Sequence, residues 1–221
     1  MDEPARTIGA STYQRIKQDI ISGALTPGRK LKLTDLKERY DTSPSTLREA
    51  LSRLVSAGFV EAPEQRGFLV APVSPEDLTE IAELRVLLET HALTLSIQNG
   101  DTEWEGDLVA AYHKLRLMEQ KMLSGDESEK VQWKRYDWEF HETLIRACKS
   151  SNLLALHARL YEKYLRYQML VLTYRGEDAA EEHRKMFEAA LARDTATAAA
   201  VLEAHVLNGL QHTLAAMGAQ S

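Results

Sequence analysis

Four residues in this chain of 221 have the types and spacing of a metal site. Asp137 and His141 lie four positions apart, so a helix would place them on one face, about one turn from each other. His183 and His205 fall in two further segments with helical patterning. One carboxylate and three imidazoles suit Zn²⁺, Ni²⁺ or Mn²⁺. The spacing alone does not require the three helices to converge, and a single histidine is more often a hydrogen-bonded bundle residue.

Catalytic motifs that would use such a metal are missing from the sequence. His141-Glu142 begins like the helix motif of zinc proteases, but Ile145 occupies the position of the second histidine. Paired Glu-x-x-His motifs of di-iron bundles do not occur, and neither does a glycine loop for phosphate. We therefore name no catalytic residue and predict that the chain is not an enzyme. A helical metalloenzyme acting on a small carboxylate is the alternative, which metal-dependent turnover would favour.

Charge is distributed unevenly along the chain, whose formal net charge is −6. Residues 1–72 hold 11 basic and 9 acidic side chains, whereas the remainder holds 16 basic and 24 acidic ones. Between Arg15 and Arg53 there are 9 basic and 5 acidic residues. A surface that faces DNA phosphates requires such a local surplus, although scattered charges by themselves indicate only a solvated face.

Proline, glycine and hydrophobic spacing divide the chain at about residue 73. The elements predicted before this point are short: helices over 12–22, after Thr34 as an N-cap and from Ser43, then β-prone runs over 59–62 and 68–71. Three helices followed by a hairpin are the order of a winged helix-turn-helix. We therefore predict this fold for residues 1–72.

Two stretches make this prediction specific. The third helix reads Ser43-Pro-Ser-Thr-Leu-Arg-Glu-Ala-Leu-Ser-Arg-Leu54, and the wing reads Gln65-Arg-Gly-Phe-Leu-Val-Ala-Pro72. Together they closely resemble the GntR family of bacterial transcription regulators. The resemblance implies that Arg48 reaches a guanine edge or a phosphate of double-stranded DNA and that the wing tip enters the minor groove.

The resemblance and the physics of groove recognition give one set of expected DNA contacts. Small hydroxyl side chains and an arginine near the start of a recognition helix suit base edges and phosphates. The expected contacts are Lys30, Lys32, Ser43, Ser45, Thr46, Arg48, Arg53, Arg66 and Gly67. The alternative is that Arg48 and Arg53 are solvated and form ion pairs with neighbouring glutamates.

The remainder, residues 73–221, is predicted to be an antiparallel helix bundle with short loops. Ser74 and Pro75 open a first helix that ends at Asn99-Gly100. Further amphipathic segments cover about 102–123, 128–149, 151–174, 178–193 and 194–217. The fold class is therefore mainly α: a winged helix-turn-helix followed by an all-helical bundle.

Residues of this bundle are similar to the metal-binding version of the FCD effector domain, found in the FadR branch of the GntR family. The matching positions are Glu83-Leu-Arg85, Asp137, His141, Glu182-His183 and His205. The resemblance implies that Asp137, His141, His183 and His205 bind a divalent transition metal, with Zn²⁺ preferred over Ni²⁺ or Mn²⁺. A small carboxylate effector would fill the open coordination positions, with Arg85 as its second contact. An ion pair of Arg85 with Glu89 is the alternative.

These expectations combine into a ligand-responsive transcription regulator. We predict a homodimeric repressor on a palindromic operator, released by its effector. The stretch Gly100-Asp-Thr-Glu-Trp-Glu105 is similar to the subgroup of carbon-starvation-induced regulators of glutarate catabolism, which implies a small dicarboxylate. An architectural DNA-binding protein is disfavoured, because an acidic bundle would repel DNA.

The cellular compartment is expected to be the cytoplasm. The single cysteine, Cys148, cannot form an internal disulfide, which fits a reducing environment. Residues 1–11 lack the apolar region of a secretory signal, and no apolar run approaches the roughly 18 residues that cross a membrane.

Overall fold

The structure is a computed structural model that describes residues 8–171 and 174–219. The described residues form two compact units. One unit contains the residues up to Asp77 together with Glu162–Leu170, and the other contains Leu78–Tyr161 together with the residues from Val171 on. The functional domains expected at 1–72 and 73–221 stay a prediction.

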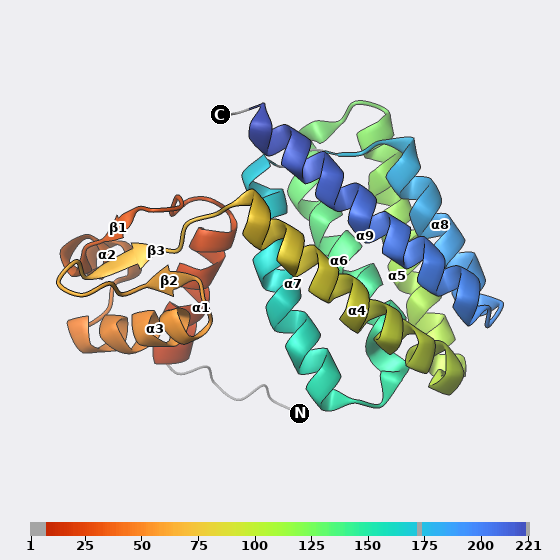
Figure 1. The fold of residues 1–221 in the computed structure, drawn as a ribbon, viewed down its shortest axis with the longest axis horizontal. Helices are drawn as coiled ribbons and strands as arrows, with labels where there is room; N and C mark the ends of the chain where they lie inside the picture. The colour runs from red at the N-terminus through yellow and green to blue at the C-terminus, as the bar shows by residue number, and fades with distance from the viewer. Residues whose placement is uncertain (1–7, 172–173, 220–221) are drawn as a thin grey trace. The chain divides into compact units, whose positions relative to one another are not determined.

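The first unit is a winged helix-turn-helix (Figure 1). Its elements are α1 (Ile8–Ile21), β1 (Lys30–Leu31), α2 (Leu33–Tyr40), α3 (Pro44–Ser56), β2 (Val60–Glu61) and β3 (Phe68–Val70). The strands form an antiparallel sheet in the order β1-β3-β2, with Lys30 opposite Leu69 and Val60 opposite Val70. The predicted order of three helices and a hairpin is confirmed.

Helix α3 is fixed at its first turn by a residue that the sequence marks as a cap. The Ser43 hydroxyl accepts a hydrogen bond from the backbone N–H of Thr46 at 3.2 Å, and Pro44 is the first helical residue. Both features favour a helix start, because the hydroxyl satisfies a free N–H and proline presets φ. Leu47 and Leu51 point into the core of this unit and are fully buried. The opposite face of α3 is therefore left to solvent.

Two local details of this unit differ from the prediction. Helix α2 begins at Leu33 with Lys32 in the cap position and no side-chain cap bond, so the assignment of Thr34 as N-cap is wrong. The Thr34 hydroxyl donates to Asp35 instead, at 2.9 Å. Strand β1 is missing from the prediction, because a strand of two residues is too short to show alternating hydrophobicity. It forms because one edge of β3 pairs with β2 and the other edge is left to hydrogen-bond with β1.

The second unit is built from long helices (Figure 1). Its elements are α4 (Pro75–Asn99), α5 (Thr102–Leu123), α6 (Lys130–Ile145), α7 (Ser151–Val171), α8 (Glu177–Leu191) and α9 (Thr195–Gly218), with short 3₁₀ turns η1 (Glu127–Glu129) and η2 (Arg146–Cys148). Parts of α4 and α7 belong to the first unit. Helix α5 packs along α6 and α8, and α8 packs along α9. The predicted all-helical bundle is confirmed, although residues 172–173 of the predicted 151–174 helix lie outside the described residues.

Side-chain caps set where two of these helices begin. Asp101 accepts a hydrogen bond from the Trp104 backbone N–H, and Asp194 accepts one from Thr197, each at 3.0 Å. Such caps satisfy N–H groups that the first turn leaves free. Within the described part of the chain, every helix is too short or too polar to cross a membrane.

Candidate metal centre and DNA-binding surface

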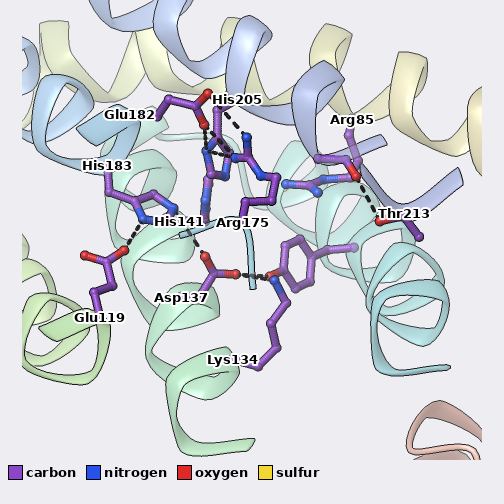
Figure 2. A network of polar contacts seen from close by, with 12 residues as sticks. Arg85, Glu119, Lys134, Asp137, His141, Arg175, Glu182, His183, His205 and Thr213 are labelled. Carbon is purple, nitrogen blue, oxygen red and sulfur yellow. Dashed lines mark hydrogen bonds and ion pairs between the residues drawn. The ribbon is translucent and has the colours of Figure 1, made fainter. Parts of the chain in front are cut away.

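The four residues singled out for metal binding come together in the second unit (Figure 2). Asp137 and His141 project from α6, His183 from α8 and His205 from α9. One possible ligand atom from each residue lies within 4.8 Å of the others. The ring centroids of His183 and His205 are 4.5 Å apart, and those of His141 and His205 are 5.0 Å apart. We refer to these four residues as the His/Asp cluster.

Burial and an unpartnered nitrogen indicate that the His/Asp cluster fits a cation. Asp137, His141 and His183 are buried, and His205 is largely so. The Nε2 atom of His183 has no hydrogen-bond partner, although Asp137 Oδ1 lies only 3.3 Å away. This nitrogen faces Asp137 without a well-formed hydrogen bond, and a metal ion bound by both groups would satisfy it. Three nitrogens and one carboxylate oxygen are donors that Zn²⁺, Ni²⁺ and Mn²⁺ accept.

The protonation of the imidazoles also fits a cation site. Burial lowers the pKa of His141 well below its usual value and that of His205 to about 4, so both rings stay neutral and able to bind a metal. Burial would lower the pKa of His183 as well, but the carboxylates of Asp137 and Glu119 outweigh it and raise this pKa to about 9. A metal ion would therefore have to displace a proton from His183 when it binds.

Charged residues outside the His/Asp cluster contact two of its members. Lys134 Nζ donates to Asp137 Oδ2 at 2.7 Å, and Glu119 Oε1 lies 2.6 Å from His183 Nδ1. Burial raises the pKa of the Asp137 carboxyl, but the charge of Lys134 and the neighbouring histidines together lower it well below its usual value. The Asp137 side chain is therefore held as a carboxylate.

His205 contacts an ion pair formed by Arg175, which lies just before α8, and Glu182 of α8. His205 Nδ1 lies 2.8 Å from Glu182 Oε2 and 3.0 Å from a terminal nitrogen of Arg175. Arg175 and Glu182 are themselves paired, with a shortest N–O distance of 2.6 Å. Figure 2 shows Glu182 and Arg175 gathered around His205, with Glu119 beside His183.

Arg85, the expected effector contact, is buried and already paired. Its guanidinium donates two hydrogen bonds to Glu89, at 2.6 and 3.0 Å, and lies 4.7 Å from the centroid of the Tyr161 ring. The alternative pairing with Glu89 is thus formed, but in the interior and not on the surface. Glu89 Oε2 lies 3.8 Å from His141 Nδ1, so this pair borders the His/Asp cluster. A role of Arg85 in effector binding stays a prediction.

Sequence reasoning missed Glu119, Lys134 and Arg175 as members of this charged interior. Lys134 carries a readable signal, because it lies three residues before Asp137 and so on the same helical face. Glu119 carries none: it is 64 residues from its partner His183 and lies on another helix.

The residues expected at DNA lie on the solvent side of the first unit. Ser43, Ser45 and Arg48 are exposed in the first turns of α3 and at its cap, while Thr46 is half-buried. The other expected contacts are exposed too: Lys30 in β1, Lys32 before α2, Arg53 later in α3, and Arg66 and Gly67 in the turn between β2 and β3.

The alternative of solvated ion pairs finds little support in these contacts. No ion pair joins Arg48 to another residue within 8–171 or 174–219. Arg53 lies over the Tyr13 ring, 4.3 Å from its centroid, and not against a glutamate. Arg48 is therefore available to a polyanion, whereas Arg53 is partly engaged within the unit.

The fold and these surfaces define a DNA-binding transcription regulator in which a winged helix-turn-helix precedes a helical bundle. The chain belongs to the GntR family of bacterial regulatory proteins: the model of that family matches residues 9–70, and the FCD domain matches residues 80–208. Members of this family are regulators and not enzymes.

Relatives of similar length support this assignment. The chain is 37% identical to the uncharacterized HTH-type transcriptional regulator BphR of Paraburkholderia xenovorans, over 91% of this chain and 83% of the relative. It is 35% identical to the HTH-type transcriptional repressor GlaR of Escherichia coli, over 88% of this chain and 90% of the relative. The fold is similar to that of E. coli McbR/YncC, with a TM-score of 0.77, 21% identity and coverage of 94% and 97% of the two chains.

Proposed function

We propose that this regulator is a repressor whose affinity for its operator is controlled by a small carboxylate. This carboxylate would bind beside a divalent metal ion at the His/Asp cluster. The observation that carries the proposal is the buried set of Asp137, His141, His183 and His205, with a nitrogen of His183 lacking a hydrogen-bond partner. Repression is supported by the name of the E. coli relative, a transcriptional repressor. The metal would be Zn²⁺, with Ni²⁺ or Mn²⁺ as the other candidates.

The charge of the interior around the cluster supports an anionic effector. Three cationic side chains (Arg85, Lys134 and Arg175) face four carboxylates (Glu89, Glu119, Asp137 and Glu182), which gives a formal charge of 0 with His183 protonated and of −1 with the neutral imidazoles that bind a metal. A divalent ion would change this sum to +1. A site of net positive charge attracts an anion, and a metal ion with open positions supplies Lewis-acid binding for a carboxylate oxygen.

A short dicarboxylate is the effector class that this arrangement favours. One carboxylate would occupy the open metal positions, and the second would require a guanidinium such as that of Arg85 or Arg175. The sequence likeness to regulators of glutarate catabolism supports the same class. Such a ligand alters DNA binding only if it binds the DNA-competent and DNA-free arrangements with different affinity.

Two copies of the chain would bind a palindromic operator, because GntR-family regulators are usually dimeric and two-fold symmetry lets two α3 helices contact adjacent half-sites. Leu84 and Leu87 on α4 and Leu156 on α7 are 41%, 64% and 56% exposed. Leu84 and Leu87 are three residues apart and so share one face of α4, and this exposed apolar face would contact the second copy. The regulator would act on operator DNA in the cytoplasm.

Metal analysis of the purified protein tests the central claim. We expect about one transition metal ion per chain, lost in both His141→Ala and His183→Ala, and operator binding that responds to glutarate only in the metal-loaded protein. Absence of bound metal, or unchanged metal content in both variants, would contradict the proposal.

Sedimentation tests the dimer separately. Leu87→Glu should convert a dimer into a monomer while leaving the metal content unchanged. A wild-type chain that sediments as a monomer at micromolar concentration, alone and on operator DNA, would exclude the two-fold arrangement.

A further inference from the structure

Hydrogen-bond chemistry determines which nitrogen of each imidazole can face a metal. A neutral imidazole has one N–H donor and one acceptor nitrogen, and only the acceptor can bind a metal ion. An ionised carboxylate accepts and never donates. A histidine whose Nδ1 contacts a carboxylate therefore carries its proton on Nδ1 and leaves Nε2 as the possible ligand.

Glu119 has this relation to His183. It is buried on α5, and its Oε1 lies 2.6 Å from His183 Nδ1. On the other side of the same ring, Nε2 is the atom that lacks a hydrogen-bond partner and lies 3.3 Å from Asp137 Oδ1. The carboxylate thus holds the ring by the edge that faces away from the His/Asp cluster.

Glu182 has the same relation to His205, but with a competitor. Both Glu182 Oε2 and a terminal nitrogen of Arg175 lie within 3.0 Å of His205 Nδ1. A guanidinium only donates, so Nδ1 can either donate to Glu182 or accept from Arg175, and not both. Only the first choice leaves Nε2 free to bind a metal.

We propose that Glu119 and Glu182 are positioning residues, which set the Nδ1–H tautomers of His183 and His205 so that both present Nε2 to the metal ion. The inference rests on the proposed metal binding. We call this pair the outer carboxylates. Carboxylates in this position are known to orient metal-binding histidines, and their loss typically lowers metal affinity 10- to 100-fold.

The two outer carboxylates differ in how firmly they are held. Glu119 is almost fully buried, and His183 is its partner at 2.6 Å. Glu182 also receives hydrogen bonds from Arg175 and from Asn208 Nδ2, the latter at 2.8 Å. Its negative charge is shared, so its influence on His205 is smaller. The expected loss of Zn²⁺ affinity is therefore larger for Glu119→Gln than for Glu182→Gln.

Arg175 provides a test that separates positioning from structural support. If the Arg175–Glu182 pair served only to hold α8 in place, Glu182→Gln and Arg175→Gln would weaken Zn²⁺ binding alike. If Glu182 sets the tautomer, the two variants differ in sign. Arg175→Gln then removes the competing donor and a repelling charge, and so does not weaken Zn²⁺ binding.

The experiment is Zn²⁺ titration of the full chain in competition with a chromophoric chelator. We expect Glu119→Gln to lose affinity 10- to 100-fold, Glu182→Gln about tenfold, and Arg175→Gln to bind at least as tightly as wild type. Glu181→Gln is the matched control, because this exposed neighbour of Glu182 pairs with Arg184 on the surface and should bind as wild type does. Equal affinity of wild type, Glu119→Gln and Glu182→Gln would overturn the inference, as would a loss in Arg175→Gln that equals the loss in Glu182→Gln.

A second measurement does not depend on whether the variants fold. Long-range ¹H–¹⁵N NMR of the Zn²⁺-loaded wild-type chain, labelled at histidine, should show protons on Nδ1 of His183 and His205. Protons on Nε2 of either ring would overturn the inference. A wild-type chain that binds no Zn²⁺, Ni²⁺ or Mn²⁺ overturns the proposed function and this inference together, whereas tight binding with unchanged variants overturns the inference alone.

Discussion

The residues expected to contact DNA and the residues around the His/Asp cluster use charge in opposite ways. In the first unit Lys30, Arg48 and Arg66 are exposed to solvent. In the second unit Arg85 and Lys134 are buried, and each is held by a carboxylate at less than 3 Å. An exposed cation is available to a polyanion and is screened by salt, whereas a buried cation must keep a partner. The exposed cations of the first unit therefore suit recognition of a polyanion, whereas Arg85 and Lys134 of the second unit are held in internal ion pairs.

The largest effect that tests this contrast is expected from Arg85→Met. The variant keeps much of the side-chain volume but leaves the Glu89 carboxylate buried without its cation, which should lower the free energy of unfolding by about 3–5 kcal/mol. All three tryptophans lie in the second unit, so urea unfolding followed by tryptophan fluorescence measures that unit selectively. His157 Nε2, 2.7 Å from Glu89 Oε1, remains as a second partner and places the loss towards the lower end of that range.

The double variant Arg85→Met with Glu89→Gln is the control for this prediction. It removes both charges and should recover part of the lost stability, because an amide is much less costly to bury than an unpaired carboxylate. Arg85→Met with wild-type stability would mean that the buried pair is not maintained in solution, and the contrast between the units would fail.

A smaller effect, confined to the other unit, is expected from Arg48→Ala. Loss of one base or phosphate contact should weaken operator binding by about 1–3 kcal/mol per half-site, roughly 5- to 150-fold. Because Arg48 is exposed and has no ion pair among the described residues, stability should not change. Fluorescence anisotropy with operator and scrambled duplexes measures the loss and its dependence on sequence.

Salt titration separates the two kinds of contact. A phosphate contact predicts uniform weakening and a salt slope smaller by about 1, whereas a base contact predicts relaxed sequence preference. Lys121→Ala, an exposed cation on α5, is the control and should leave operator binding unchanged. If Arg48→Ala bound the operator with wild-type affinity, the assignment of α3 as the recognition helix would be wrong.

The elements of both units could be predicted from sequence because helical spacing and caps are local signals. The predicted segment 102–123 coincides with α5, and Ser43 caps α3 as expected. The prediction failed where two local signals compete: Thr34 has the chemistry of an N-cap, but its hydroxyl donates to Asp35, and the observed cap, Lys32, lies two residues earlier.

The interior of the second unit could be predicted only in part. Asp137 and His141 share one helix, so their spacing reports their proximity directly. The approach of His183 and His205 came from a family likeness, because no local signal reports how helices pack. Glu119 was missed for the same reason, because hydrogen bonds between helices leave no spacing in the sequence, and Glu182 was named only through the family likeness, without a role.

A modest effect on the first unit is expected from Ser43→Ala. Loss of the hydroxyl that accepts the Thr46 N–H should destabilise α3 by about 1 kcal/mol, whereas Ser43→Gly should cost only a few tenths. Hydrogen exchange of the α3 amides measures this local change. If Ser43→Ala abolished operator binding without faster exchange, Ser43 would contact DNA and not act mainly as a cap.

The smallest effect is expected from Arg184→Met, which sharpens the comparison because it repeats the Arg85 experiment at the surface. Arg184 pairs with Glu188 four residues on, the same spacing as Arg85 and Glu89, but both partners are exposed. Solvent screens such a pair and each charge remains hydrated when the other is removed, so urea unfolding should not resolve a change. A loss for Arg184→Met as large as that for Arg85→Met would mean that helix spacing, and not burial, determines what an ion pair contributes to this bundle.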